Sequence, residues 1–204
     1  IAEGFLPLLR SWHESGKFED SWKKLRLVVA HATEIYIDLG MNQSPFNVGL
    51  PIDLLEFNAQ QVKSFAEGYG LTLSVDSVTK LMAMVGGHPD LLSQAFDYLK
   101  NHQAGDKTLD SLLALAPTEA GIYGSHLYLL LTSIQEHPEL LDAVKQLVST
   151  TNPVRLDATI TRKLESIGLV ERHGNDCSFR CNLYRLYFSD RILGSREQGV
   201  GSRE

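Results

Sequence analysis

Two short stretches of the sequence carry residue types that could contact a ligand, and the first of them follows an apolar run. Residues 25–30 (LRLVVA) are apolar and rich in β-branched side chains, a pattern that predicts a strand buried on both faces. His31 and Thr33 come directly after it. In open α/β sheets ligands bind at the carboxyl ends of strands, so these two side chains could contact one. The alternative is a strand end whose polar side chains meet solvent.

The second stretch is Gly86-Gly87-His88-Pro89, near the middle of the chain. The two glycines end one apolar helix. Proline suits the first turn of the next helix, where its missing N–H would have no partner in any case. The pattern predicts a tight, rigid corner between two helices. A plain helix end followed by a helix start is the alternative to a ligand site here.

The sequence contains no set of residues typical of a catalytic or metal site. Ser15-Gly16-Lys17 lacks the preceding glycine and strand of a phosphate-binding loop. No acidic strand end that could hold Mg²⁺ precedes the first helix, and no nucleophile, histidine and acid form a triad. Cys177 and Cys181 have no second pair and no histidine cluster, which argues against zinc. We therefore expect no catalytic residue and no metal ligand in this chain.

The composition is that of an ordinary globular protein. Of the 204 residues, 43% are hydrophobic and 22% are charged, enough for one large domain or two small ones with a real core. The net charge of −6 argues against a nucleic-acid coat protein or a membrane-surface protein. No apolar run approaches the roughly 20 residues of a membrane span, and no signal peptide is visible. Two cysteines, expected to be reduced, predict a cytoplasmic protein.

Helical periodicity recurs along most of the chain. The predicted helices cover residues 4–16, 59–69, 77–85, 89–102, 109–116, 122–136, 138–150, 158–167 and 183–193. Four of them are expected to be capped, by Asn58, Asp76, Asp106 and Asn182. Short strands are predicted at residues 154–156, 169–172 and 177–181, the last two as a hairpin. Because a helix pattern is already under way at Ile1, we expect an upstream part to be missing.

The order of elements after residue 122 is the outline of a winged helix: two helices, a short strand, a helix, a β-hairpin and a final helix. This part carries a small basic excess, and its candidate nucleic-acid contacts are Arg162, Lys163 and Arg172. A DNA-binding wing usually needs a denser basic face, so we expect packing or protein contact instead. The tail 194–204 repeats Gly-Ser-Arg-Glu at both ends, which predicts disorder.

Several runs of the sequence occur in an order that resembles a known family. They are residues 8–14 (LLRSWHE), 25–34 (LRLVVAHATE), 42–49 (NQSPFNVG), 86–89 (GGHP), 116–123 (APTEAGIY) and 180–184 (RCNLY). Together they resemble the C-terminal part of a bacterial AAA-like ATPase domain of the STAND class of signalling NTPases, related to Orc/Cdc6-type AAA+ and NB-ARC proteins. The resemblance covers nearly all of residues 1–193, without the family's P-loop and Walker B segment.

The resemblance implies a mainly α fold with a small β part. The fold begins with the remnant of an α/β AAA+ core, made of one helix and one buried strand. A helical lid bundle and a winged helix follow. The implied boundaries are 1–57 for the end of the α/β core, 58–117 for the lid, 118–193 for the winged helix and 194–204 for a disordered tail.

The resemblance also implies roles for the two candidate stretches. Thr33 corresponds to the polar sensor of the γ-phosphate, with His31 beside it. Gly87, His88 and Pro89 match a Gly-x-Pro motif, whose proline packs near adenine and ribose and reports nucleotide state to the lid. ATP or ADP with Mg²⁺ would bind only if the missing P-loop segment is supplied. The implied partners are the N-terminal NTPase half, fused effector domains or other proteins, and neither DNA nor a membrane.

The sequence is therefore interpreted as the nucleotide-sensing and lid/winged-helix half of a signalling ATPase. We expect this chain alone not to hydrolyse ATP, so whether it belongs to an enzyme depends on the absent half. Two alternatives remain open. One is a DNA-binding winged-helix regulator, and the other is a protein-interaction adaptor built on the helical bundle.

Overall fold

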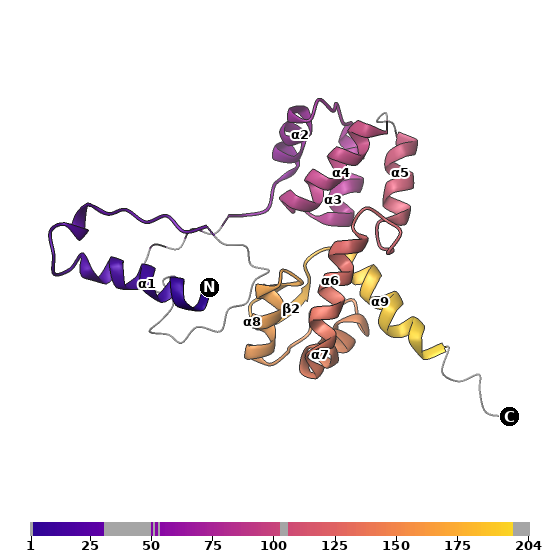
Figure 1. The fold of residues 1–204 in the computed structure, drawn as a ribbon. Helices are drawn as coiled ribbons and strands as arrows, with labels where there is room; N and C mark the ends of the chain where they lie inside the picture. Colours follow the sequence, from indigo (N-terminus) through magenta and orange to yellow (C-terminus); the bar gives the residue numbers. More distant parts are fainter. Residues whose placement is uncertain (1, 31–49, 51, 53, 103–105, 198–204) are drawn as a thin grey trace. The chain divides into compact units, whose positions relative to one another are not determined.

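The computed structural model describes residues 2–30, 50, 52, 54–102 and 106–197 (Figure 1). The chain divides into two compact units, Ile1–Leu55 and Glu56–Glu204, and each is described by itself. The described residues are mainly helical, with one two-stranded antiparallel sheet. This confirms the predicted mainly α fold with a small β part.

The first unit contains helix α1 (Ala2–Ser15) and the 3₁₀ turn η1 (Trp22–Lys24). The rings of Trp12 and Trp22 stack, with their centroids 6.0 Å apart and their planes at 23°. This aromatic pair packs η1 against α1. The position of α1 matches the predicted helix 4–16 to within two residues.

Residues 25–30 do not form the predicted buried strand. They have no strand assignment and are exposed along their whole length, with Val28 at 95%. A strand needs a hydrogen-bonded neighbour, and no segment in the described part of the first unit pairs with this run. The prediction of a buried strand here is therefore wrong, because an apolar pattern states what a segment could bury and not whether a partner strand is present. The α/β core that it implied is not seen in the described residues.

The second unit begins with four helices: α2 (Ala59–Gly68), α3 (Val75–Val85), α4 (Pro89–Asn101) and α5 (Asp106–Leu115). Asn58 caps α2 as predicted. Its Oδ1 accepts the backbone N–H of Gln61 at 3.0 Å, while the Gln61 side chain accepts the N–H of Asn58 at 3.0 Å. This reciprocal capping box satisfies two N–H groups that the helix itself leaves unpaired.

The predicted cap of α3 is wrong by two residues. Ser74 is the N-cap, and its Oγ accepts the backbone N–H of Ser77 at 3.0 Å. Asp76 instead lies in the first turn, where a negative charge is favourable beside the helix N-terminus. Asp106 is the first residue of α5, and residues 103–105 lie outside the described part of the chain.

The remaining elements are α6 (Gly124–Gln135), α7 (Pro138–Val148), α8 (Ala158–Ser166), β1 (Val170–His173), β2 (Asp176–Phe179) and α9 (Asn182–Glu197). The two strands form an antiparallel hairpin that pairs Val170 with Phe179 and His173 with Asp176. Val154 adds one isolated bridge to Cys177 in place of the predicted strand 154–156. The expected order of helices and hairpin is confirmed, and its assignment to a winged helix stays a prediction.

Helix α9 is longer than predicted at its C-terminal end. It continues to Glu197, so the first four residues of the tail 194–204 are helical and not disordered. Residues 198–204 lie outside the described part of the chain. Among the described helices, none is long and apolar enough to cross a membrane.

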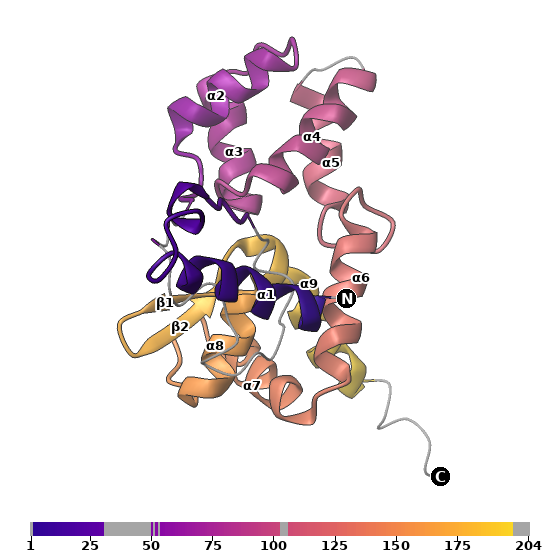
Figure 2. The ribbon, with the colours of Figure 1, turned by 60° about the vertical axis from the view of Figure 1, so that its left-hand side comes forward.

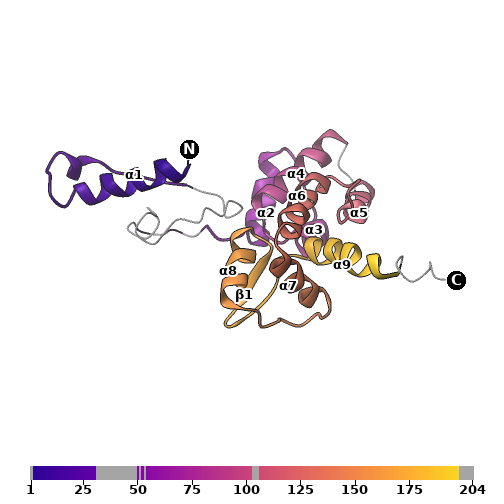
Figure 3. The same ribbon diagram turned by 60° about the horizontal axis from the view of Figure 1, so that its bottom comes forward.

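One continuous hydrophobic core joins the helices of the second unit. It includes Leu81 and Val85 from α3, Phe96 from α4, Leu127 from α6 and Phe188 from α9, all with 0% exposure. Helix α9 packs against α3, α6 and α7, as Figures 2 and 3 show. Each such side chain stabilises the fold by roughly 1.5–3 kcal/mol on burial. The helices on both sides of residue 117 therefore share one close-packed core.

Replacing Asn58 with alanine removes both hydrogen bonds of the capping box. We expect Asn58→Ala to lower the free energy of unfolding by about 1 kcal/mol. The exposed Gln60 on the same helix is the control, and Gln60→Ala should change the free energy by less than about 0.5 kcal/mol. Urea denaturation followed by circular dichroism measures both, and equal effects would contradict the role given to the cap.

Candidate functional site

The corner between α3 and α4 begins with a glycine in a left-handed conformation. Helix α3 ends at Val85, and Gly86 has φ 66° and ψ −152°. Side chains make this backbone conformation unfavourable for other residues. The N–H of Gly86 still donates to the carbonyl of Met82 at 2.9 Å, which closes the last helical turn. The sequence prediction that glycine ends this helix is confirmed.

The corner ends where His88 and Pro89 start α4. His88 is the N-cap, and its Nδ1 accepts the backbone N–H of Leu91 at 3.5 Å. Pro89 occupies the first turn, as predicted, and is exposed. Gly87, between the two helices, is buried. The corner thus combines a buried backbone with an accessible proline ring.

The backbone of Gly87 lies directly against the backbone of Phe57. The N–H of Phe57 donates to the carbonyl of Gly87 at 2.9 Å. A Cβ atom added at Gly87 would lie 2.1 Å from the carbonyl oxygen of Phe57 and 2.7 Å from its nitrogen, far inside van der Waals contact. Only glycine fits at this position. The segment before α2 is therefore held against the corner by a main-chain hydrogen bond and close backbone packing.

Glu56 connects the same corner to the end of the hairpin. Its Oε2 accepts the N–H of Gly87 at 3.0 Å, and its Oε1 accepts Nε–H of Arg180 at 2.6 Å. Arg180 follows β2, and its own N–H donates to the carbonyl of Leu169 at 3.0 Å. Both side chains are less than one third exposed. One carboxylate therefore joins three segments that are distant in sequence.

Sequence reasoning missed both Glu56 and Arg180 as residues of the corner. They are 124 residues apart, so no local spacing or periodicity relates them. Glu56 precedes a capping asparagine and Arg180 follows a short strand, positions where a charged side chain is ordinarily solvent-exposed. Only the tertiary packing brings them together with Gly87.

Burial keeps two titratable groups near the corner neutral. Desolvation raises the pKa of the Cys181 thiol to about 12, outweighing the N–H groups of Tyr184 and Leu183, which favour the thiolate. Desolvation also raises the pKa of Tyr123, whose hydroxyl donates to the carbonyl of Leu91 at 3.0 Å. Burial therefore favours the protonated, neutral form of both groups. Within the described residues, no group of three or more His, Cys, Asp or Glu side chains could hold a metal ion.

The other predicted site residues fall into two groups, those outside the described residues and those on α8 and β1. His31 and Thr33 lie outside the described residues, so their relation to Pro89 stays a prediction. Lys163 pairs with Glu139 at 3.4 Å, an acid on α7. The pKa of Glu139 is lowered, mainly by a backbone hydrogen bond and also by Lys163.

The candidate nucleic-acid contacts show little free positive charge. Arg172 pairs with Glu165 at 2.9 Å through its Nε, and Lys163 is engaged with α7 as described. Arg162 is exposed on α8. A phosphate-binding face requires cations that are not already neutralised by neighbouring acids. The arrangement of these three residues gives no support to a DNA-binding face.

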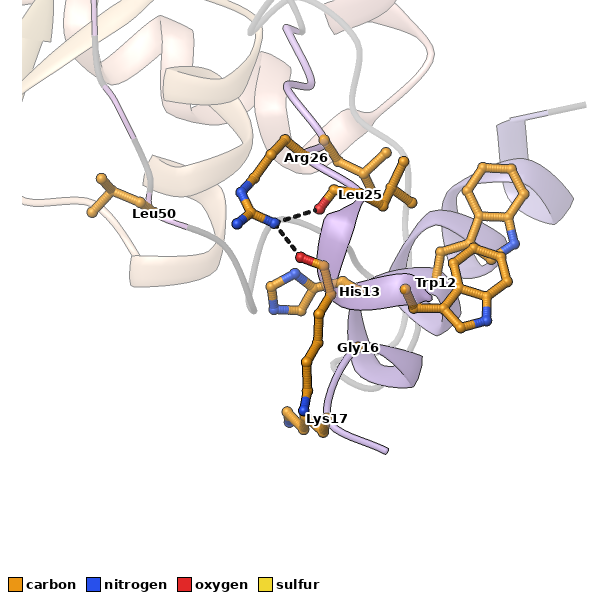
Figure 4. Close-up of a pocket in the computed structure, with 10 residues that line it drawn as sticks. Trp12, His13, Gly16, Lys17, Leu25, Arg26 and Leu50 are labelled. Carbon is orange, nitrogen blue, oxygen red and sulfur yellow. Dashed lines mark hydrogen bonds between the residues drawn. The ribbon is translucent and has the colours of Figure 1, made fainter. Parts of the chain in front are cut away.

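A pocket of about 650 Å³ lies within the first unit (Figure 4). Its lining includes the stacked Trp12 and Trp22, together with Lys17 and Arg26. One nitrogen of the Arg26 guanidinium, Nη1, donates to the carbonyls of Lys23 and Leu25 at 2.5 Å and 3.1 Å. Among the described residues, this lining includes none of those that the sequence predicts as ligand contacts.

Replacing Gly87 with alanine forces a methyl group into the backbone of Phe57. We expect Gly87→Ala to lower the free energy of unfolding by about 2 kcal/mol or more, since the two segments must separate to admit it. Gly68 on α2 is a matched control, because its added Cβ meets no atom within 4 Å. Gly68→Ala should be neutral or stabilising by up to about 1 kcal/mol. Similar losses in the two variants, measured by urea denaturation, would refute the close approach at the corner.

The comparisons with known proteins place these features in a family. A family model described as an AAA-like domain matches residues 1–190, which spans both units and includes the corner and the hairpin. Searches of curated proteins and of solved structures return no match. A match over nearly the whole chain points to a nucleotide-related, ATPase-like function. The chain belongs to the AAA-like domain family.

Proposed function

We propose that this chain is the nucleotide-sensing and lid/winged-helix half of an AAA-like signalling ATPase of the STAND class. One observation carries the proposal: in a chain of the AAA-like family, Gly87-His88-Pro89 forms a fixed corner that presents an exposed proline. A residue that reports the state of a bound nucleotide must be accessible to it and rigidly connected to the protein. Pro89 is exposed and follows the fixed Gly87 peptide by two residues, which supports this role.

A second His-Pro pair in the same unit supports this assignment by contrast. His137 and Pro138 start α7 with the same sequence and with proline in the first turn. No glycine directly precedes them, and the His137 side chain makes no capping hydrogen bond. At the corner, the His88 side chain accepts a capping hydrogen bond. The residue before it is Gly87, which fits against Phe57 because it has no side chain. Starting a helix requires none of these additional features.

The corner is suited to the base and ribose of a nucleotide rather than to its phosphates. The N–H and the carbonyl of Gly87 are both hydrogen-bonded within the protein, and Arg180 is paired with Glu56. The exposed pyrrolidine ring of Pro89 offers an apolar contact. His31 and Thr33 contact the γ-phosphate in this proposal. The P-loop and Mg²⁺ are supplied by a segment outside these 204 residues, so the chain alone does not hydrolyse ATP.

Residues 58–117 act as the lid and residues 118–193 as a winged helix that restrains it. The shared hydrophobic core across residue 117 supports a direct mechanical connection between the two. The ion pairs of Lys163 and Arg172 favour protein contact over DNA binding. The partners are the N-terminal NTPase half and effector domains joined to it.

The decisive variant is Pro89→Ala, studied in the protein that contains this chain together with its P-loop segment. Limited proteolysis of the wild type should give different fragment patterns with ADP and with ATP–Mg²⁺. We expect Pro89→Ala to reduce this difference severalfold while the fold is retained, because alanine leaves the first turn helical but removes the ring. The isolated chain of 204 residues should release no phosphate from ATP above the buffer control.

Pro138→Ala is the matched control, since Pro138 occupies the same position of α7 and is also exposed. It should leave the nucleotide-dependent difference unchanged. A full response in Pro89→Ala, or an equal loss in Pro138→Ala, would show that the corner is not the sensor. A natural polypeptide without any P-loop would equally contradict the proposal.

A further inference from the structure

We infer that Glu56 is a positioning residue that couples the α3–α4 corner to the end of the β-hairpin. Glu56, Gly87 and Arg180 together form what we call the Glu56 clasp. The clasp makes the orientation of the Gly87 peptide depend on Arg180, although these two residues do not bond to each other directly. As a route by which nucleotide state would reach the hairpin, it rests on the proposed function. As a mechanical coupling, it stands on the geometry of this chain alone.

The two oxygens of the Glu56 carboxylate have different partners. Oε1 is 2.6 Å from Nε of Arg180, a charge-assisted hydrogen bond. Oε2 is 3.0 Å from the backbone nitrogen of Gly87. Because the carboxylate is planar and rigid, Arg180 fixes the direction in which Oε2 points. Release of Arg180 leaves the carboxylate free to rotate away from the corner.

Each segment held by the clasp is also fixed by a backbone hydrogen bond. The carbonyl of Gly87 accepts the N–H of Phe57 at 2.9 Å, so residues 56 and 57 hold the corner at two points. The N–H of Arg180 donates to the carbonyl of Leu169, just before β1, at 3.0 Å. The backbone is hydrogen-bonded at both ends of the clasp, at Gly87 and at Arg180. A displacement of one of these two backbone segments is therefore passed to the other through Glu56.

Gly86 makes room for the carboxylate. A Cβ added at Gly86 would lie 2.9 Å from Oε2 of Glu56 and 3.9 Å from Cβ of Cys181. The left-handed conformation of Gly86 already favours glycine at this position. The two glycines of the corner thus serve different contacts, Gly87 the main chain of Phe57 and Gly86 the side chain of Glu56.

The exposure of the clasp suits a contact that can open and close. The side chains of Arg180 and Glu56 are 28% and 31% exposed. Water can solvate both charges when the pair separates, so opening the pair does not leave an unpaired charge buried in the protein. The pair is nevertheless better shielded than Arg172–Glu165, which joins β1 of the same hairpin to α8 and has exposures of 49% and 36%. Within the described residues no hydrogen bond or ion pair joins that second pair to the corner, so it provides a matched control.

The test is hydrogen exchange at the Gly87 amide, measured by NMR on the 204-residue chain without nucleotide. Without Arg180 the Glu56 carboxylate can turn away, and the Gly87 N–H then loses its hydrogen bond to Oε2. We expect Arg180→Ala to accelerate exchange of the Gly87 amide at least about tenfold, since a hydrogen bond to a charged group contributes at least that factor. Arg172→Ala should leave the rate unchanged. Arg180→Lys, which keeps the positive charge, should restore part of the protection, a rescue that a purely structural packing role would not give.

Unchanged exchange at Gly87 in Arg180→Ala would overturn the coupling, and so would an equal acceleration in Arg172→Ala. If Arg180→Ala fails to unfold cooperatively, Arg180→Gln, which keeps most of the side chain length, takes its place with the same expected result. Because no nucleotide is present, this outcome is independent of the response of Pro89→Ala to ADP and ATP–Mg²⁺. Failure of the coupling and failure of the proposed function are thus distinguishable.

Discussion

The arrangement of the second unit depends on the close contact between the backbones of Gly87 and Phe57. Both polar groups of Gly87 are hydrogen-bonded to residues 56 and 57, and no side chain larger than hydrogen fits between the two segments. This contact fixes the entry to α2 against the turn from α3 to α4. Through Glu56 it also fixes the exit of the hairpin. Three regions far apart in the sequence meet at one peptide, and the surrounding close-packed helices resist its displacement.

The position of Pro89 follows from this constraint. A proline in the first turn of a helix is common and by itself carries no function. Here Gly87, two residues earlier, is buried and hydrogen-bonded to residues 56 and 57. We propose that a displacement of the exposed ring is therefore passed to α3, α4 and the hairpin. This is the physical basis for the sensing role that we propose for the corner of this AAA-like domain.

Local features of this fold could be predicted from the sequence because local chemistry determines them. The glycines of the corner, the Pro89 helix start and the Asn58 cap each depend on neighbours within a few residues. Residues 25–30 could not be predicted in this way. A strand there would need a neighbouring strand to pair with, and the sequence of the run does not say whether one is present. The sequence alone does not locate the cap of α3, because Ser74 and Asp76 are both acceptable caps and only the backbone conformation decides between them.

The residues of the candidate site also differ in whether the local sequence could predict them. Gly87 and Pro89 carry local signals, whereas Glu56 and Arg180 carry none, because a pair 124 residues apart depends on the complete tertiary fold. The roles of His31 and Thr33 came from family resemblance, and both lie outside the described residues. The family match supports the general function, and the corner supplies the specific residues through which it can be examined.

The most direct measurement of nucleotide sensing is the amide resonance of Gly87 in the protein that includes the P-loop segment. Its spectrum would be compared in the ADP and ATP–Mg²⁺ states, with the amide of Glu139 at the start of α7 as the internal reference. We expect the Gly87 resonance to differ between the two states and the Glu139 resonance to stay the same. An identical Gly87 resonance in both nucleotide states would contradict this expectation.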